Sequence, residues 1–371
     1  MTGPLSGLTV LDLTTVIAGP YATQMLGDMG AEIIKIEGPA GDIMRAPGPA
    51  RSAGMGAAFL NCNRNKENLC LDLKKPADLA RLAELLSEAD VFVHNMRMKA
   101  ARRLRLDPET LADRYPRLVY CAITGFGQDG PYRDRPAYDD IIQAASGWAS
   151  LAADADEAPS YAPTIVADKT AGLHAVSAIT AALFHRERTG EGQAIEVPMF
   201  EAMVSFLAIE HLAGQSFVPS KGPCGYSRLL TPWRRPYRAA DGYIAVMPYT
   251  ASHWSAFFQA SDRADWAADP ALADDAERAA SIGQLYERLA DCLKSRTVGE
   301  WVSLLDQLQI PCSPVNRLDD LPGDEHVRAT GLFLPVDHPT EGEMITVRPP
   351  VRFSRTPCSI RTLAPAQKGV C

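Results

Sequence analysis

The sequence contains no long apolar run, no targeting leader and no paired cysteines. No stretch approaches the roughly 20 uninterrupted apolar residues that a membrane-spanning helix needs, and the first residues lack the basic and apolar regions of a secretory signal. The eight cysteines are scattered and none forms a CxxC pair, which argues against a disulfide framework and a zinc site. We therefore expect a cytoplasmic protein with no membrane partner and no metal.

An excess of positive charge is also missing. The formal net charge of the 371 residues is −8, whereas nucleic-acid-binding proteins usually present a basic field. We therefore expect no nucleic-acid partner, although a few local arginines and lysines can still hold an anionic ligand. The hydrophobic fraction of 46 % and the charged fraction of 22 % are typical of a globular protein, and the length suits two domains.

Three familiar ligand and catalytic motifs are absent. Residues 8–37 alternate between strand, loop, helix and strand and end at Glu37, which invites a dinucleotide-binding interpretation. The loop, however, has only Gly19 and then Pro20, whose nitrogen carries no hydrogen to offer a pyrophosphate. There is also no GxxxxGK[ST] phosphate loop and no GxSxG nucleophile elbow. Dinucleotide binding, P-loop phosphoryl transfer and serine hydrolysis are therefore not favoured.

Strand and helix patterns alternate along the first half of the chain. The expected strands cover 8–13, 31–36, 68–73, 91–93, 118–124 and 193–197, and the main expected helices cover 21–29, 76–88, 108–114 and 169–188. Such alternation predicts an α/β fold with a doubly wound parallel sheet and helices on both faces. Ligands usually bind such sheets beyond the carboxyl ends of the strands.

The composition changes near residue 215. Residues 215–225 are rich in Gly, Pro and Ser, as in a linker. A hairpin is expected over 236–246, followed by mostly helical sequence. We expect a large domain made of 1–224 and 336–371, and a smaller α+β domain made of 225–335.

Asp168 stands directly before the expected helix 169–188. Asp is favoured at a helix N-cap, where it contributes about 1 kcal/mol, and this structural role alone explains its position. The helix N-terminus also favours an ionised carboxylate, which is the form that covalent acyl transfer requires. The local pattern is therefore compatible with both roles.

Basic residues gather between positions 45 and 105, many of them after expected strand ends. They are Arg45, Arg64, Lys66, Lys74, Lys75, Arg97, Lys99, Arg102, Arg103 and Arg105. A solvated surface explains any single one of them. As a set they are compatible with a phosphate-rich ligand such as coenzyme A.

Eight segments match one protein family in order and over nearly the whole chain. They are 7–12, 18–20, 26–37, 41–45, 61–66, 71–74, 136–139 and 168–193. The most specific are Tyr138-Asp139 and the run that starts at Asp168 and ends with RTGEGQ. On these segments the chain resembles the family III CoA-transferases, or CaiB/BaiF family, which include the formyl-CoA:oxalate and carnitine CoA-transferase types.

The resemblance implies a Rossmann-like large domain built from both chain ends, a small inserted domain, and a homodimer of two interlocked subunits. It implies that Asp168 is the catalytic nucleophile, which takes coenzyme A from an acyl-CoA donor and passes it to a carboxylic acid acceptor. Coenzyme A then enters as part of the substrate.

The residues expected to bind coenzyme A come mainly from the resemblance. They are Val16, Leu71, Lys74, Asn95, Met96, Arg103 and Tyr138, together with Ala18 from the matched segment 18–20 and Arg97, which we add for its charge and position.

Two questions stay open: whether the chain catalyses CoA transfer or another reaction of the same superfamily, and which acid it uses. A related branch racemises 2-methylacyl-CoA thioesters and pairs its aspartate with a histidine just before the segment that corresponds to Tyr138-Asp139. No histidine stands there, and the nearest preceding one is His94, so we favour the transferase. Arg228 and the Trp233-Arg234-Arg235 run could present cations to a dicarboxylate such as succinate or mesaconate, although a surface role explains them equally well.

Overall fold

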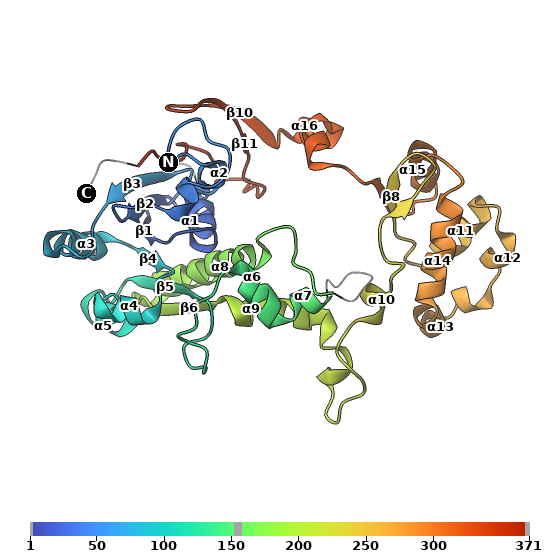
Figure 1. Ribbon diagram of the computed structural model, residues 1–371, viewed down its shortest axis with the longest axis horizontal. Coiled ribbons are helices and arrows are strands. Elements are labelled where there is room, and N and C mark those ends of the chain that lie inside the picture. Colours follow the sequence, from blue (N-terminus) through green and yellow to red (C-terminus); the bar gives the residue numbers. More distant parts are fainter. Residues whose placement is uncertain (1–2, 152–157, 368–371) are drawn as a thin grey trace. The chain divides into compact units, whose positions relative to one another are not determined.

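The computed structural model describes residues 3–151 and 158–367 and divides into two compact units (Figure 1). Unit 1 comprises the chain up to Leu207 and again from Glu325, and unit 2 comprises Ala208–Asp324. Both divisions lie earlier in the chain than the expected boundaries after 224 and 335. The second division is earlier because the strand that starts at Phe333 forms a hairpin with the next strand, and Arg64 of unit 1 donates to the Val347 carbonyl oxygen (2.6 Å).

Unit 1 contains a parallel sheet, a hairpin and most of the longer helices. The parallel strands are β1 (Thr9–Leu13), β2 (Glu32–Glu37), β3 (Lys66–Cys70), β4 (Val91–His94), β5 (Val119–Thr124) and β6 (Ala194–Pro198), and the hairpin strands are β10 (Phe333–His338) and β11 (Gly342–Val347). The helices are α1 (Ala18–Asp28), η1 (Ile43–Arg45), α2 (Ala57–Cys62), α3 (Pro76–Glu88), α4 (Met98–Arg103), α5 (Pro108–Arg114), α6 (Asp139–Ser146), α7 (Trp148–Leu151), α8 (Val166–Thr189), α9 (Met199–His211) and α16 (Glu325–Thr330). The last residues of α9 belong to unit 2, which begins at Ala208.

The sheet has six strands in the order β3-β2-β1-β4-β5-β6, and every neighbouring pair is parallel. The order reverses between β1 and β4, which is the arrangement of the Rossmann fold. The predicted α/β, doubly wound, Rossmann-like sheet is therefore confirmed. Both faces of the central strands are buried, which explains their nearly continuous apolar sequences.

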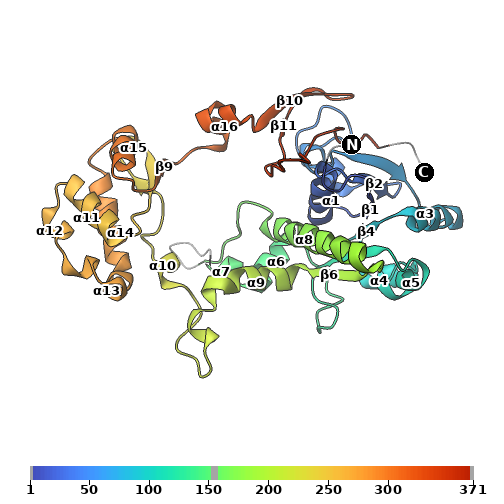
Figure 2. The same cartoon turned by 180° about the vertical axis from the view of Figure 1, so that it is seen from behind.

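Successive residues of the central strands face opposite layers, as the strand period of two requires. Val10 and Val93 pack in one hydrophobic cluster with residues of α1, α6, α8 and α9. Leu11 and Phe92 pack in a second cluster with residues of α3, α4 and α5. The long helix α8 runs beside α6 in both views (Figures 1 and 2), so the helix that carries Asp168 belongs to the first layer.

Helices α1 and α8 approach each other closely at Gly172. A Cβ at this position would lie 2.9 Å from the Ala18 carbonyl oxygen, so only glycine fits without a shift. Ala171 and Ala175, on the same helix, are fully buried in the first hydrophobic cluster.

Unit 2 joins a small antiparallel sheet to a group of short helices. The sheet consists of β7 (Tyr237–Arg238), β8 (Tyr243–Val246) and β9 (Cys312–Pro314), and the β7–β8 pairing confirms the predicted hairpin. The helices are η2 (Ala213–Ser216), α10 (Ser227–Leu230), α11 (Ala251–Ala260), α12 (Ala264–Ala267), η3 (Pro270–Leu272), α13 (Asp275–Ala280), α14 (Ile282–Leu293), α15 (Val298–Gln307) and η4 (Leu318–Gly323). Its own core is aromatic and includes Trp254, Phe257, Phe258, Tyr286 and Trp301.

Across the two ranges that the structure describes, no helix combines the length and the apolar character needed to cross a bilayer.

Candidate active site

A cavity of about 290 Å³ lies at the carboxyl ends of the strands where the sheet order reverses. Val16 follows β1, and Asn95, Met96 and Arg97 follow the neighbouring strand β4. The crevice between two such strands is the usual ligand site of an open α/β sheet. The structure brings seven of the predicted site residues to this cavity. They are Val16, Ala18, Asn95, Met96, Arg97, Tyr138 and Asp168.

Three predicted residues lie outside the cavity. Leu71 is buried in the hydrophobic cluster beneath α3, with 5 % of its surface exposed. Lys74 follows it on the exposed connection between β3 and α3, and Arg103 is exposed at the end of α4. A ligand confined to this cavity would therefore not contact them.

Two arginines that line the cavity were missed in the sequence. Arg133 and Arg135 belong to the loop that follows β5, and the Arg135 guanidinium lies over the Tyr132 ring, 3.7 Å from its centroid. The rule that basic residues follow strand ends would have found them if it had been applied beyond residue 105. With Arg97, they give the cavity three cationic side chains.

The turn after β1 has an unusual backbone. Val16 has a φ of 71°, in the left-handed region that β-branched residues rarely adopt. Its N–H donates to Asp42 Oδ1 (3.1 Å), and the preceding residue, Thr15, exchanges two hydrogen bonds with the Asn95 side chain (3.1 and 2.8 Å). Such strain persists where surrounding contacts fix the backbone, often at functional sites. Here these hydrogen bonds fix one wall of the cavity.

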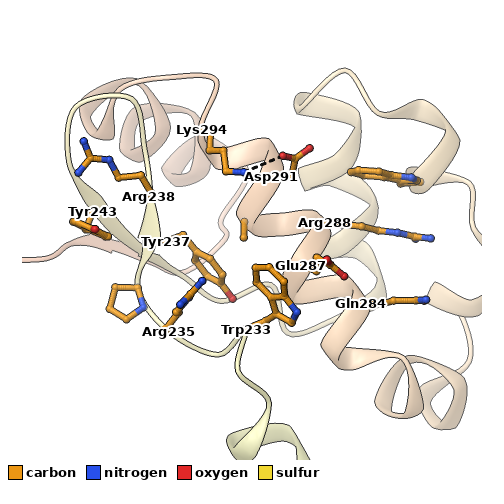
Figure 3. A pocket seen from close by; sticks show the side chains of 13 residues that line it. Trp233, Arg235, Tyr237, Arg238, Tyr243, Gln284, Glu287, Arg288, Asp291 and Lys294 are labelled. Atoms are coloured by element: carbon orange, nitrogen blue, oxygen red, sulfur yellow. Dashed lines mark hydrogen bonds and ion pairs between the residues drawn. The ribbon is translucent and has the colours of Figure 1, made fainter. Parts of the chain in front are cut away.

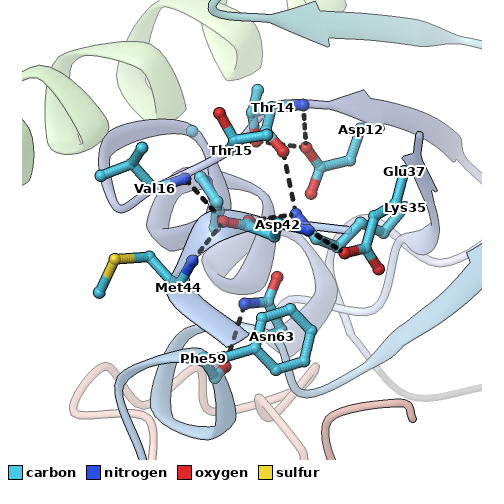
Figure 4. A network of polar contacts seen from close by, with 12 residues as sticks. Asp12, Thr14, Thr15, Val16, Lys35, Glu37, Asp42, Met44, Phe59 and Asn63 are labelled. Carbon is cyan, nitrogen blue, oxygen red and sulfur yellow. Dashed lines mark hydrogen bonds and ion pairs between the residues drawn. The ribbon is translucent and has the colours of Figure 1, made fainter. Parts of the chain in front are cut away.

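A buried polar network supports this turn from below (Figure 4). Lys35 Nζ donates to the Thr14 carbonyl oxygen (2.9 Å) and to Asp42 Oδ2 (3.0 Å). Lys66 Nζ donates to Asp12 Oδ2 (3.0 Å). Burial alone would raise the pKa of Asp12, but the Lys66 and Lys35 ammonium groups hold this pKa well below its usual range. Asp12 therefore stays ionised and paired.

Three of the basic residues that suggested a phosphate ligand have a different role. Lys66 is bound to Asp12 as described, Arg64 pairs with Asp28 (2.7 Å), and Arg45 pairs with Glu37 (2.6 Å), all of them buried. These three residues are neither on a solvated surface nor free to bind a phosphate, because buried acids neutralise their charges. The Glu37–Arg45 pair also removes the acid that a dinucleotide ribose would need.

Asp168 lies in the first turn of α8, not at its N-cap. The helix starts at Val166 and Ile165 is its N-cap, with no side-chain capping bond. Asp139 of α6 supplies the missing acceptor, because its Oδ1 accepts hydrogen bonds from the N–H groups of Ala167 (2.7 Å) and Asp168 (3.0 Å). The N-cap interpretation of Asp168 is therefore wrong, and its carboxylate is left for another role.

The environment of Asp168 disfavours its ionised form. Only 7 % of the residue is exposed, and no arginine or lysine of the described chain forms an ion pair with it. Burial, and then the negative charge of Asp139, raise the pKa of Asp168 to about 7. A carboxylate with a raised pKa is more basic and more weakly solvated, and such groups gather at functional sites.

His94 does not supply a second base beside Asp168. It is fully buried, its Nε2 lies 2.5 Å from the Tyr120 hydroxyl, and its Nδ1 accepts from the Met96 N–H (3.1 Å). Burial lowers its pKa to about 4. None of the described residues that line the cavity is a histidine, so the histidine that the racemase branch pairs with its aspartate has no counterpart there.

Unit 2 has a larger cavity, of about 780 Å³, which several charged side chains line (Figure 3). Lys294 forms an ion pair with Asp291 (3.2 Å), and Arg288 forms one with Asp269 (3.2 Å). Arg235, from the arginine run noted in the sequence, also lines this cavity. Arg228 lies in a different, smaller cavity.

Comparisons with known proteins agree along the whole chain. The model of the CoA-transferase family III matches residues 5–368. The chain is 33 % identical to the succinate--glutarate CoA-transferase of Agrobacterium fabrum, over 95 % of this chain and 90 % of that protein. It is 35 % identical to the succinyl-CoA:mesaconate CoA-transferase of Haloarcula hispanica, over 95 % and 91 % respectively. A crystal structure of a CAIB/BAIF family protein from Brucella suis superposes with a TM-score of 0.83 at 30 % identity, over 99 % of this chain and 97 % of that one.

Proposed function

The chain belongs to the CoA-transferase family III and moves coenzyme A from an acyl-CoA thioester to a carboxylic acid, and we propose that Asp168 is the covalent nucleophile of this transfer. The observation that carries the proposal is the buried carboxylate of Asp168, which lines a cavity together with arginines. Among the described residues it neither caps the helix nor forms an ion pair. A weakly solvated carboxylate attacks a carbonyl carbon more readily than a hydrated one.

The reaction consists of four displacements that each form one bond and break one. The Asp168 carboxylate attacks the donor thioester carbonyl and releases coenzyme A as a thiolate, which leaves a mixed anhydride. The thiolate attacks the Asp168 carbonyl carbon, releases the donor acid as its carboxylate and forms an aspartyl thioester. The acceptor carboxylate attacks this thioester and releases the thiolate again. The thiolate then attacks the acceptor carbonyl, and Asp168 regains its carboxylate. Protons and electrons balance without a further reactant.

Asp139 prepares this chemistry without reacting. By accepting from the N–H groups of Ala167 and Asp168, it anchors the start of α8 and fixes where the nucleophile lies. Its negative charge also raises the pKa of Asp168. Because these two N–H groups are already bonded to Asp139, they are not available to stabilise an oxyanion.

We propose that the anionic part of the acyl-CoA is held by Arg97, Arg133 and Arg135, whose guanidinium groups suit phosphate oxygens. Val16, Ala18, Asn95, Met96 and Tyr138 line the same cavity. Coenzyme A is larger than this cavity, so the exposed side chains of Lys74 and Arg103 remain candidate contacts outside it. Leu71 is the weakest of the proposed contacts because it is buried.

We propose dicarboxylic acids as the substrate class. The two curated relatives are named for succinate, glutarate and mesaconate, each of which carries two carboxylates. A cytoplasmic location and an interlocked homodimer remain part of the proposal.

Hydroxylamine trapping tests the proposed intermediate, because hydroxylamine attacks both anhydrides and thioesters. We expect it to inactivate the wild-type enzyme only when an acyl-CoA donor is present, and to leave a hydroxamate on Asp168. Asp168→Asn should lower kcat by at least about 10³-fold, as expected when a covalent nucleophile is removed. Inactivation that requires no donor, or a hydroxamate elsewhere, would refute the role of Asp168.

A further inference from the structure

The carboxylate of Asp139, which anchors the start of α8, is itself held at both oxygens. Its Oδ1 accepts from the N–H groups of Ala167 (2.7 Å) and Asp168 (3.0 Å). Its Oδ2 accepts from Gln143 Nε2, one turn further along α6. A carboxylate rotates readily about its Cβ–Cγ bond, and a bond to the second oxygen limits this rotation. Gln143 therefore keeps Oδ1 aimed at the start of the helix that carries Asp168.

The side-chain amide of Gln143 is fixed from its other end as well. Its Oε1 accepts from the Ala162 N–H (2.8 Å), and the residue is fully buried. A backbone N–H can only donate, so the amide oxygen has to face Ala162 and the amide nitrogen has to face Asp139. Three donors thus meet the two oxygens of Asp139, an arrangement that suits an ionised carboxylate.

Gln143 also ties down the segment that leads into α8. Ala162 lies shortly before the helix start at Val166, and it is the only residue of 158–165 that is partly buried. Asp139 holds the helix start, and Gln143 holds both Asp139 and the chain that approaches it. The position of a nucleophile matters strongly, because a displacement of about 1 Å can lower a rate roughly 100-fold.

We propose that Gln143 is a positioning residue of the CoA transfer, which acts through Asp139 to hold Asp168 where it can attack the thioester. The inference rests on the proposed function, since it concerns how the proposed nucleophile is placed. Gln143 does not line the cavity. Its loss should therefore slow the chemical step without weakening the binding of the acyl-CoA donor.

Gln143→Met tests this difference, because it keeps the length of the side chain but removes its donor and its acceptor. We expect kcat to fall roughly 10- to 100-fold, as for the loss of a hydrogen bond to a charged group, and the KM for succinyl-CoA to change less than about threefold. Gln24→Met is the matched control, since Gln24 is also a buried glutamine of unit 1 whose Oε1 accepts a backbone N–H, that of Arg64 (3.2 Å). It should lower the thermal unfolding midpoint but change kcat and KM by less than about threefold.

An exchange of groups shows whether Gln143 acts through Asp139. Asp139→Asn turns an amide nitrogen toward the amide nitrogen of Gln143, so that one donor faces another. Adding Gln143→Glu supplies two acceptor oxygens, one for that amide and one for the Ala162 N–H, and restores each bond. We expect Asp139→Asn combined with Gln143→Glu to have a kcat roughly tenfold above that of Asp139→Asn alone. Combination with Gln143→Met should bring no such gain.

The rate at which the coenzyme A adduct forms on Asp168 separates this inference from the proposed function. It is followed by mass spectrometry of samples quenched after mixing with succinyl-CoA. An active wild-type enzyme that forms no adduct would refute the proposed nucleophile. If the wild type forms the adduct and Gln143→Met forms it equally fast, the positioning role alone is refuted. A change confined to KM, or no gain from the exchange, would overturn it as well. The thermal unfolding midpoint identifies a misfolded Gln143→Met, and the exchange then decides.

Discussion

The burial of Asp168 and its nearness to Asp139, which suit a nucleophile, also make the activity of the enzyme depend on pH. Burial and the nearby Asp139 raise the pKa of the carboxyl group to about 7, and only the ionised form attacks a thioester. We therefore expect kcat/KM for the acyl-CoA donor to be low near pH 5.5, to rise through about pH 7 and to level off above pH 8. The pH dependence of kcat/KM reports the ionisation in the free enzyme.

Asp139→Asn tests the cause of this shift. The variant keeps an oxygen that accepts from the N–H groups at the start of α8 but removes the negative charge. The pKa of Asp168 should fall, and the rise in kcat/KM should move to lower pH. A profile that stays in place would show that Asp139 acts only by position.

The burial of Asp168 also predicts a cost in stability. The pKa is raised from 3.8 to about 7 in the folded chain, so folding disfavours the ionised form. The loss of stability is absent below pH 3.8, grows as the pH rises and is complete above about 7. Asp168→Asn, which is uncharged, should therefore raise the free energy of unfolding at pH 8 by on the order of a few kcal/mol and change it little at pH 4.

Denaturant unfolding at the two pH values measures this difference. Asp113→Asn, an exposed aspartate of α5, is the control and should change the free energy of unfolding by less than about 0.5 kcal/mol at both. Equal effects of Asp168→Asn at pH 4 and pH 8 would contradict the shifted pKa.

At the scale of elements, the close contact of α1 with α8 positions Asp168. Gly172→Val would place a side chain against the Ala18 carbonyl oxygen and force the helices apart. We expect it to lower the free energy of unfolding by roughly 1–3 kcal/mol and to reduce kcat, because α8 carries the nucleophile. Gly299→Val in α15 is the matched control, since nothing lies within 4 Å of its added Cβ. If both variants were equally stable and active, the contact would have no such role.

The strands of the parallel sheet and its longer helices could be predicted, but the short helices α2, α4 and α6 and two helix starts were not. The sequence Ala18-Gly19-Pro20 suggested a loop, whereas α1 begins at Ala18, because proline is tolerated in a first helical turn. Helix α8 begins at Val166, before Asp168, because Asp139 from another helix provides the capping acceptor. Local pattern cannot reveal a partner that is distant in sequence, and the same limit hid Asp28, the acid that neutralises Arg64.

At the scale of the whole molecule, the candidate site follows from the strand order. Val16, Asn95 and Asp168 are far apart in sequence but meet where the order reverses between β1 and β4, and this meeting could be anticipated from strand ends and from family resemblance. Arg133 and Arg135 also follow an expected strand, so the sequence could indicate them, but that their loop returns to the cavity required the coordinates.

The proposed homodimer predicts a property of the whole molecule. Large apolar side chains are exposed on α8 and α9, among them Leu173, Phe184, Phe206 and Ile209, and a second chain would cover such surfaces. Sedimentation equilibrium should give the mass of two chains. The mass of one chain at micromolar concentration would contradict the dimer and leave the proposed chemistry untouched.

The central claim, a covalent link between Asp168 and coenzyme A, is tested most directly by intact-protein mass spectrometry after incubation with succinyl-CoA. The account predicts a wild-type adduct with the mass of one coenzyme A less one water, removed by hydroxylamine and absent from Asp168→Asn. An active wild-type enzyme that never carries the adduct, or an adduct that persists in Asp168→Asn, would contradict it.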